Sequence, residues 1–215
     1  MNKTKEENKK KPDRRVERTR RLLHNALMEL IVEKGYEAIT VQNIIDRANV
    51  GRSTFYSHFL DKQQLLLYGF KHLRAFLAEQ QRKNDSEKAN DNDERMLKFS
   101  LAMFRHAESH YKLYRAMVGK KSGAFVIRHI QLMIADLVRD EFAASKPHPA
   151  SRIPIEVIVQ YTANSFMALM TWWADKKMPC SAQDIDQMFH TLTMPGVKLA
   201  LGPGSTKHGQ KGKRE

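Results

Sequence analysis

The sequence has few of the features that would indicate a secreted or membrane-spanning protein. It contains one cysteine, Cys180, which excludes a disulfide framework within the chain and favours a reducing compartment. No apolar run approaches the roughly 18 residues from which a membrane-spanning helix is inferred. Residues 1–15 are basic but lack the apolar stretch of a secretory signal. Together these absences predict a cytoplasmic protein.

Acidic residues are outnumbered, with 24 Asp and Glu against 37 Lys and Arg, and the resulting net charge of +13 is densest at the two ends of the chain. Basic ends suit a polyanionic partner such as DNA, RNA or an anionic membrane surface. A charge that only keeps the protein soluble is the alternative. Hydrophobic residues form 41% of the chain, which is enough to fill a core, so we expect a folded protein with basic ends.

The N-terminal region begins with a tail and a helix. Residues 1–13 lack periodicity and are predicted to be a disordered basic tail. From Arg18 onward, apolar residues recur at helical spacing, and Gly35 is placed to end the helix because glycine adopts a positive φ without strain. The buried face of this first helix is predicted to consist of Leu23, Ala26, Leu27, Leu30 and Ile31.

Two shorter helices follow, separated by a tight turn. Thr40 is the predicted N-cap of the first of them, which buries Val41, Ile44, Ile45 and Ala48. Asn49 tolerates the left-handed conformation that a turn needs, and Gly51 can cap a third helix over residues 52–58. The third helix is polar and rich in hydroxyl groups. This arrangement predicts a helix-turn-helix domain over residues 14–62 whose last helix enters the major groove of DNA.

The rest of the chain is also predicted to be helical, with no strands and no internal repeats. Pro147 and Pro149 mark a loop, Pro179 ends a long apolar helix, and Ser181 caps the last helix, which is expected to reach Met194 and resume beyond Pro195. The fold class is therefore all-α with about nine helices, and residues 202–215 are a second disordered basic tail. Expected helices in this part cover residues 61–83, 94–109, 111–118, 124–145, 153–177 and 182–200.

The N-terminal motif resembles the DNA-binding domain of the TetR family over residues 16–65, without a gap. Two positions depart from the family pattern: Asn49 stands where glycine is common, and Gly51 stands where serine is common. Both serve the backbone roles of turn and cap, although Gly51 lacks a hydroxyl group that often contacts phosphate. The residues that carry the resemblance are Thr19, Arg20, Ala26, Gly35, Tyr36, Thr40, Val41, Ile44, Ala48, Val50, Ser53, Thr54, Phe55, Tyr56, Ser57, His58, Phe59 and Lys62.

The resemblance implies an all-α homodimer in which the last two long helices, 153–177 and 182–200, pair with those of the second copy. It also implies that residues 63–201 form a ligand-binding and dimerisation domain. A small molecule bound inside that domain would lower the affinity for DNA.

Candidate DNA contacts lie on and around the third helix. Arg52 is placed to pair bidentately with guanine, and a simple phosphate contact is the alternative. Thr40 either caps its helix alone or also helps to receive a phosphate at the helix N-terminus. Tyr56 is expected to contribute partly through packing and partly through a contact of its hydroxyl with phosphate. Lys62 is placed to reach phosphate. The full candidate set is Arg18, Arg20, Thr40, Arg52, Ser53, Thr54, Tyr56, Ser57, His58 and Lys62.

A largely apolar effector is expected, because few charges interrupt the apolar helix faces of the second half. The alternative for each apolar side chain is that it only fills the core. The candidate pocket residues are Phe99, Met103, Phe104, Tyr114, Phe125, Met133, Phe166, Met170 and Trp173.

Other chemistry has little support in the sequence. His106 and His110 have the spacing of metal ligands on a helix, but no further ligand can be placed beside them, so no metal or cofactor is expected. Cys180 is either a redox sensor or an idle thiol, and the second reading is favoured. The chain has no Gly-rich phosphate loop and no Gly-x-Ser-x-Gly motif, which argues against an enzyme.

The function predicted from the sequence is a repressor that binds a palindromic operator as a dimer and is released by a small molecule. Two alternatives remain at this stage. One is a regulator that is released by a partner protein, and the other is an activator, since the sequence does not fix the sign of regulation.

Overall fold

The computed structural model describes residues 14–86, 96–118, 124–144 and 153–201, and all regular structure in these ranges is helical. This confirms the all-α prediction. The two predicted tails, residues 1–13 and 202–215, lie outside the described residues. The helices are α1 (Arg14–Lys34), α2 (Val41–Ala48), α3 (Arg52–Tyr56), α4 (Lys62–Ser86), α5 (Phe99–Ser109), α6 (Tyr111–Val118), α7 (Ala124–Ala144), α8 (Ile155–Asp175) and α9 (Ala182–Leu201).

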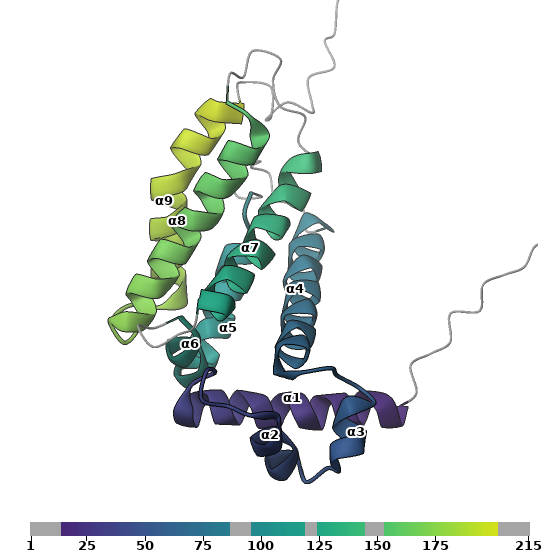
Figure 1. Cartoon of the computed structure of the whole chain (residues 1–215). Coiled ribbons are helices and arrows are strands. Elements are labelled where there is room, and N and C mark those ends of the chain that lie inside the picture. Colours follow the sequence, from purple (N-terminus) through teal and green to yellow (C-terminus); the bar gives the residue numbers. More distant parts are fainter. Residues whose placement is uncertain (1–13, 87–95, 119–123, 145–152, 202–215) are drawn as a thin grey trace, which may run out of the picture.

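The molecule consists of an upright bundle standing on a small three-helix unit. Helix α1 runs across the lower end of the bundle, and α2 and α3 lie beyond it on the far side from α4–α9 (Figure 1). Helix α1 contacts α2 on one side and α4 and α6 on the other. It therefore belongs to the helix-turn-helix and also forms the floor of the bundle. We call α4–α9 the body.

An aromatic cluster forms the centre of the body. The Phe166 ring lies 4.7 Å from that of Phe104 and 5.4 Å from that of Phe189, measured between ring centroids. The Phe104 ring meets Trp173 edge-on at 5.6 Å, and the indole N–H of Trp173 donates to the carbonyl of Cys180 at 3.0 Å. All four rings are fully buried. Because the cluster joins α5, α8 and α9, it holds the long helices in one packed core.

Several helix boundaries differ from the sequence prediction, and four differences are informative. Helix α1 begins at Arg14 instead of Arg18, and α3 ends at Tyr56 instead of His58. Helix α5 begins at Phe99 instead of Glu94, because Leu97 has a φ of +60° and turns the chain there. Helix α9 continues through Pro195 without a break. Pro195 is on an exposed side of α9, where water can satisfy the carbonyl that its missing N–H leaves free.

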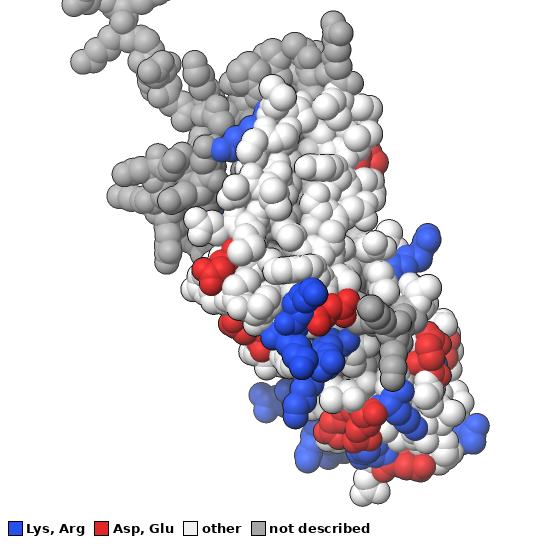
Figure 2. Space-filling model, turned by 90° about the vertical axis from the view of Figure 1, so that its left-hand side faces the viewer, with Lys and Arg blue, Asp and Glu red and all other residues white. Residues whose placement is uncertain are grey.

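Helices α8 and α9 present an apolar face to solvent. The exposed side chains on α9 include Leu192, which is 66% exposed, and Leu199, which is 85% exposed. On α8 the corresponding residues are Val157, Tyr161 and Trp172. Figure 2 views this side of the molecule and shows few charges over its upper part, with Lys, Arg, Asp and Glu gathered lower down, toward the helix-turn-helix. None of the described helices is long and apolar enough to cross a membrane.

Candidate DNA-binding surface and effector cavity

The two ends of α2 and the start of α3 are defined by local backbone chemistry. The Thr40 hydroxyl accepts from the backbone N–H of Asn43 at 3.2 Å, and the Asn43 side chain accepts from the N–H of Thr40 at 3.0 Å. Asn49 ends α2 in the left-handed conformation, with φ 51° and ψ 51°. Gly51 is the N-cap of α3. The predicted roles of Thr40, Asn49 and Gly51 in the backbone are therefore confirmed.

Helix α3 is a single short segment with one buried side and one exposed side. Phe55 is fully buried, and its ring contacts those of Tyr56 and Phe59. Arg52, Ser53, Tyr56 and Ser57 are exposed on the other side, and Thr54 and His58 are half-buried. The guanidinium of Arg52 lies 5.8 Å from the centre of the Tyr56 ring. This contact leaves the donors of Arg52 available to an external acceptor.

Lys62 has a different environment from the one that the sequence suggested. Its ammonium donates to three backbone carbonyls in the chain before α2, those of Tyr36, Glu37 and Ile39, at 3.1, 3.2 and 2.8 Å. It also lies 4.6 Å from the centre of the Tyr36 ring. A lysine has three N–H donors, and all three are used here. Lys62 therefore joins the start of α4 to the α1–α2 connection, and it has no donor left for phosphate.

The arginines near the start of α1 are placed unequally. Arg18 is exposed, whereas Arg20 is half-buried and its Nε has no hydrogen-bond partner among the described residues. Further along the unit, Arg47 of α2 pairs with Glu33 at 2.7 Å and with Glu29 at 3.1 Å, both on α1. Arg47 is thus a clamp between two helices, while Arg18 is available at the surface.

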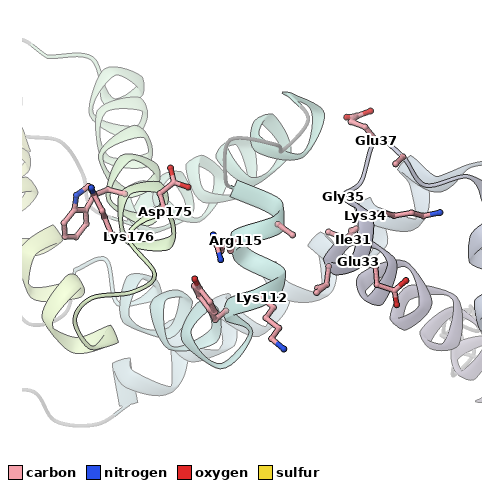
Figure 3. Close-up of a pocket in the computed structure, with 14 residues that line it drawn as sticks. Ile31, Glu33, Lys34, Gly35, Glu37, Lys112, Arg115, Asp175 and Lys176 are labelled. Carbon is pink, nitrogen blue, oxygen red and sulfur yellow. The ribbon is translucent and has the colours of Figure 1, made fainter.

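A wide groove lies beside the end of α1, between it, α6 and the end of α8. It has a volume of about 1040 Å³, and half of its 14 lining residues are charged. Figure 3 shows Glu33 and Lys34 of α1 and Glu37 just beyond it on one side of the groove, and Lys112 and Arg115 of α6 with Asp175 and Lys176 at the end of α8 on the other. Charges of both signs line both walls. Such a surface is poorly suited to enclose an apolar ligand.

A second, smaller cavity has the opposite character. It has a volume of about 580 Å³ and lies where α1 meets α4, α5, α6 and α7. Among the described residues that line it, none is Lys, Arg, Asp or Glu. Its size is within the range of roughly 300–1,000 Å³ that is usual for small-molecule sites. The lining residues are His24, Asn25, Met28, Leu66, Gly69, Phe70, His72, Leu73, Phe76, Met103, His106, His110, Leu113, Tyr114, Met117 and Ile130.

The predicted pocket residues divide between this cavity and the core. Met103 and Tyr114 line the cavity. Phe125 is half-buried and stacks on Tyr36 with 5.9 Å between ring centroids. The other predicted residues are buried in the interior away from the cavity: Phe99, Phe104, Met133, Phe166, Met170 and Trp173.

Most of the cavity was not identified from the sequence. Its α1 wall, with His24 and Met28, was missed because α1 was assigned to the DNA-binding unit alone. Gly69 was the one available signal, since a glycine inside a helix usually has a packing reason. A Cβ at this position would lie 2.2 Å from Nε2 of His24, so the absence of a side chain at Gly69 lets α1 approach α4.

The polar groups of the cavity are mostly imidazoles. His106 and His110 are stacked, with 4.4 Å between their ring centroids. Nδ1 of His106 lies 3.1 Å from the hydroxyl of Tyr114, which is itself buried. Burial, followed by the neighbouring His110, lowers the pKa of His106 to about 4, so this ring is neutral at pH 7. Burial likewise lowers the pKa of His24.

Metal and thiol chemistry gain no support from the geometry. Within the described residues no group of three or more His, Cys, Asp or Glu side chains is arranged to hold a metal ion. Burial, together with the nearby Asp184 carboxylate, raises the pKa of the Cys180 thiol, which disfavours the reactive thiolate.

Comparison with known proteins agrees with this geometry. Residues 23–68 match the family model described as bacterial regulatory proteins of the tetR family. Residues 94–195 match a second model, described as a transcriptional regulator C-terminal region. The chain belongs to the TetR family. Members of this family are transcriptional regulators and not enzymes, so the prediction that the chain is not an enzyme is confirmed.

Individual relatives of this TetR-family chain support the same assignment. An uncharacterised helix-turn-helix regulator of Bacillus subtilis, YxbF, is 43% identical over 61 residues, which are 28% of this chain and 16% of the relative. The chain thus matches only a small part of that protein. A TetR regulator from Streptococcus agalactiae has a similar structure, with 25% identity, a TM-score of 0.61 and coverage of 84% of this chain and 96% of that one. The fatty acid degradation regulator FadR of Bacillus halodurans shares the fold, with 17% identity, a TM-score of 0.61 and coverage of 88% and 97%.

Proposed function

We propose that this TetR-family protein is a cytoplasmic repressor that binds a palindromic operator as a homodimer and releases it when a small, largely apolar effector binds in the body. The observation that supports this proposal most strongly is the geometry of the turn between α2 and α3, together with the side chains that α3 exposes. Asn49 and Gly51 set the angle between α2 and α3, and Phe55 anchors α3 from below. Arg52 and Ser53 are then exposed at the start of α3, where a recognition helix meets base edges.

The remaining DNA contacts in the proposal are backbone contacts. The exposed hydroxyl of Tyr56 and the guanidinium of Arg18 are placed to reach phosphates. The Ser57 hydroxyl donates its hydrogen to the carbonyl of Thr54 at 2.8 Å, so it reaches a phosphate only by exchanging that bond. Thr40 is exposed at the N-terminus of α2, where the positive end of the helix dipole favours an anion. Thr54, His58 and Arg20 remain candidates at half-buried positions, and Lys62 is assigned to the structural role described above.

The exposed apolar face of α8 and α9 supports dimerisation through these two helices. A contiguous apolar face with few charges is uncommon on a monomeric protein and is typical of an interface. Two copies joined through this face form a four-helix bundle around a two-fold axis, which places two recognition helices on one side. A palindromic site matches that symmetry.

The cavity between α1 and α4–α7 is the proposed effector site. It combines suitable size, an uncharged lining and contact with α1 of the DNA-binding unit. An occupant of this cavity touches helices from both parts of the chain. It alters operator affinity to the extent that it binds one relative placement of these helices more tightly than another.

The experiment that tests the proposal is selection of random duplex DNA with the purified protein, followed by footprinting of the selected site at two salt concentrations. We expect a palindrome, protection of two half-sites and binding that weakens steeply with salt. Arg52→Ala should weaken binding by about tenfold or more and relax the preference at one base pair of each half-site. Arg128→Ala removes an exposed charge from α7 in the body and is the matched control. Failure to select any site, or a non-palindromic site, would contradict the proposal.

A further inference from the structure

We infer that the effector cavity is selective for a neutral aromatic molecule that carries a hydroxyl group, such as a phenol, over an anion or a molecule without a hydrogen-bond donor. This inference rests on the proposed function, because it specifies the ligand class of the same site. It follows from three features of the lining: the absence of charge, the protonation of the imidazoles and the flat aromatic walls.

The first feature excludes charged ligands. The described lining residues include no carboxylate to balance a cation and no Lys or Arg to balance an anion. An ion that enters such a cavity loses its hydration without gaining a partner, which is costly. His106 does not supply a balancing positive charge at neutral pH, because burial keeps its ring neutral. The occupant is therefore uncharged.

The second feature requires a donor on the ligand. Nδ1 of His110 lies 2.9 Å from the backbone carbonyl of His106. A carbonyl only accepts, so Nδ1 of His110 carries a hydrogen, and Nε2 is the acceptor in the tautomer that this bond defines. No hydrogen bond to this Nε2 occurs among the described residues, and His110 lies at the exposed edge of the lining. A ligand hydroxyl that enters beside this ring can donate to it.

The neighbouring ring offers a similar arrangement. The Tyr114 hydroxyl donates to the sulfur of Met103 at 3.5 Å, so Nδ1–H of His106 donates to the Tyr114 oxygen in that pattern. Nε2 of His106 is then a second acceptor, on a ring that stacks on that of His110. Two parallel imidazoles that both accept are complementary to one or two ligand hydroxyls.

The third feature favours a flat ring. The stacked pair of His106 and His110 is one flat wall, and the Phe76 ring lies 6.0 Å from that of His106. The remaining lining adds the rings of Phe70 and Tyr114 and several aliphatic or sulfur-containing side chains, which pack against an aromatic ligand; its other polar side chains are His24, Asn25 and His72. An aromatic alcohol thus satisfies the walls and the acceptors together.

The test is isothermal titration of the full chain at pH 7 with three probes that share one ring system: 2-naphthol, 2-methoxynaphthalene and 2-naphthoate. The first carries a donor, the second only an acceptor, and the third a negative charge. We expect 2-naphthol to bind at least tenfold more tightly than 2-methoxynaphthalene, and 2-naphthoate not to bind measurably. Equal or tighter binding of either of the other probes, or no binding of 2-naphthol, would overturn the inference.

Variants test whether the preference for 2-naphthol depends on His110. His110→Phe keeps a flat ring but removes the acceptor, so it should weaken 2-naphthol about tenfold and leave 2-methoxynaphthalene unchanged. A merely structural role of His110 would weaken both probes equally, and that result would count against the inference. His129→Phe is the matched control, since His129 is a half-buried histidine of α7 outside the cavity.

Operator binding, measured with the same preparations, separates this inference from the proposed function. Operator binding without any probe binding would remove the ligand class and leave the DNA-binding proposal intact. Selective binding of 2-naphthol in a protein that recognises no operator would support the ligand class and contradict the repressor.

Discussion

The helix-turn-helix and the body differ in how far apart in the sequence the residues lie that form their functional surfaces. In the helix-turn-helix, Thr40, Asn49 and Gly51 act on backbone groups within three or four residues of themselves. The cavity, by contrast, is lined by residues of α1 and of four helices of the body, between His24 and Ile130. The comparison teaches that a surface for DNA can be set by local turn chemistry, whereas a cavity depends on how distant helices pack. The predictions below test this contrast.

The largest expected effect is that of Phe166→Ala in the body. The Phe166 ring is fully buried and contacts those of Phe99, Phe104 and Phe189, so truncation leaves a large void. We expect the free energy of unfolding to fall by about 3–5 kcal/mol in urea denaturation. Because α1 packs on the body through α4 and α6, DNA binding should be lost in the same urea range. Survival of DNA binding after the body has unfolded would show that the helix-turn-helix is stable by itself.

An intermediate effect is expected at Lys62, which joins the two regions. Lys62→Met removes three hydrogen bonds from a charged donor to the carbonyls of Tyr36, Glu37 and Ile39. The free energy of unfolding should fall by about 2 kcal/mol. The dependence of DNA affinity on salt concentration should keep its slope, because no phosphate contact is lost. A reduced slope, of the kind expected when a phosphate contact such as that of Arg18 is lost, would restore Lys62 to the DNA contacts.

The same difference in sequence separation explains which features could be predicted from the sequence. Helix periodicity predicted all the helices of the described residues, and the cap at Thr40 and the turn at Asn49 were predicted because their partners are close in sequence. The start of α5 was missed because it depends on Leu97, whose N–H donates to Glu141 of α7. In the cavity, apolar periodicity marked Phe104 and Trp173 as well as Met103, since a buried helix face has the same pattern whether it meets other side chains or an empty space.

The smallest expected effect is at Asn49 and tests whether the turn is as local as its geometry indicates. Asn49 has a φ of 51°, a conformation that costs most residues with a Cβ about 1 kcal/mol or more and glycine almost nothing. Asn49→Ala should therefore lower the free energy of unfolding by about 1 kcal/mol, and Asn49→Gly should leave it nearly unchanged. The comparison is clean because Asn49 is exposed and its backbone N–H, which bonds to Asp46 and Ile45, is kept in both variants. Urea denaturation of both variants measures the difference, and 2-naphthol titration should be unaffected in either, since the cavity lies on the other side of α1. If both variants destabilised the protein equally, the side chain of Asn49 and not its backbone conformation would define the turn, and the angle of α3 would depend on contacts beyond its immediate neighbours.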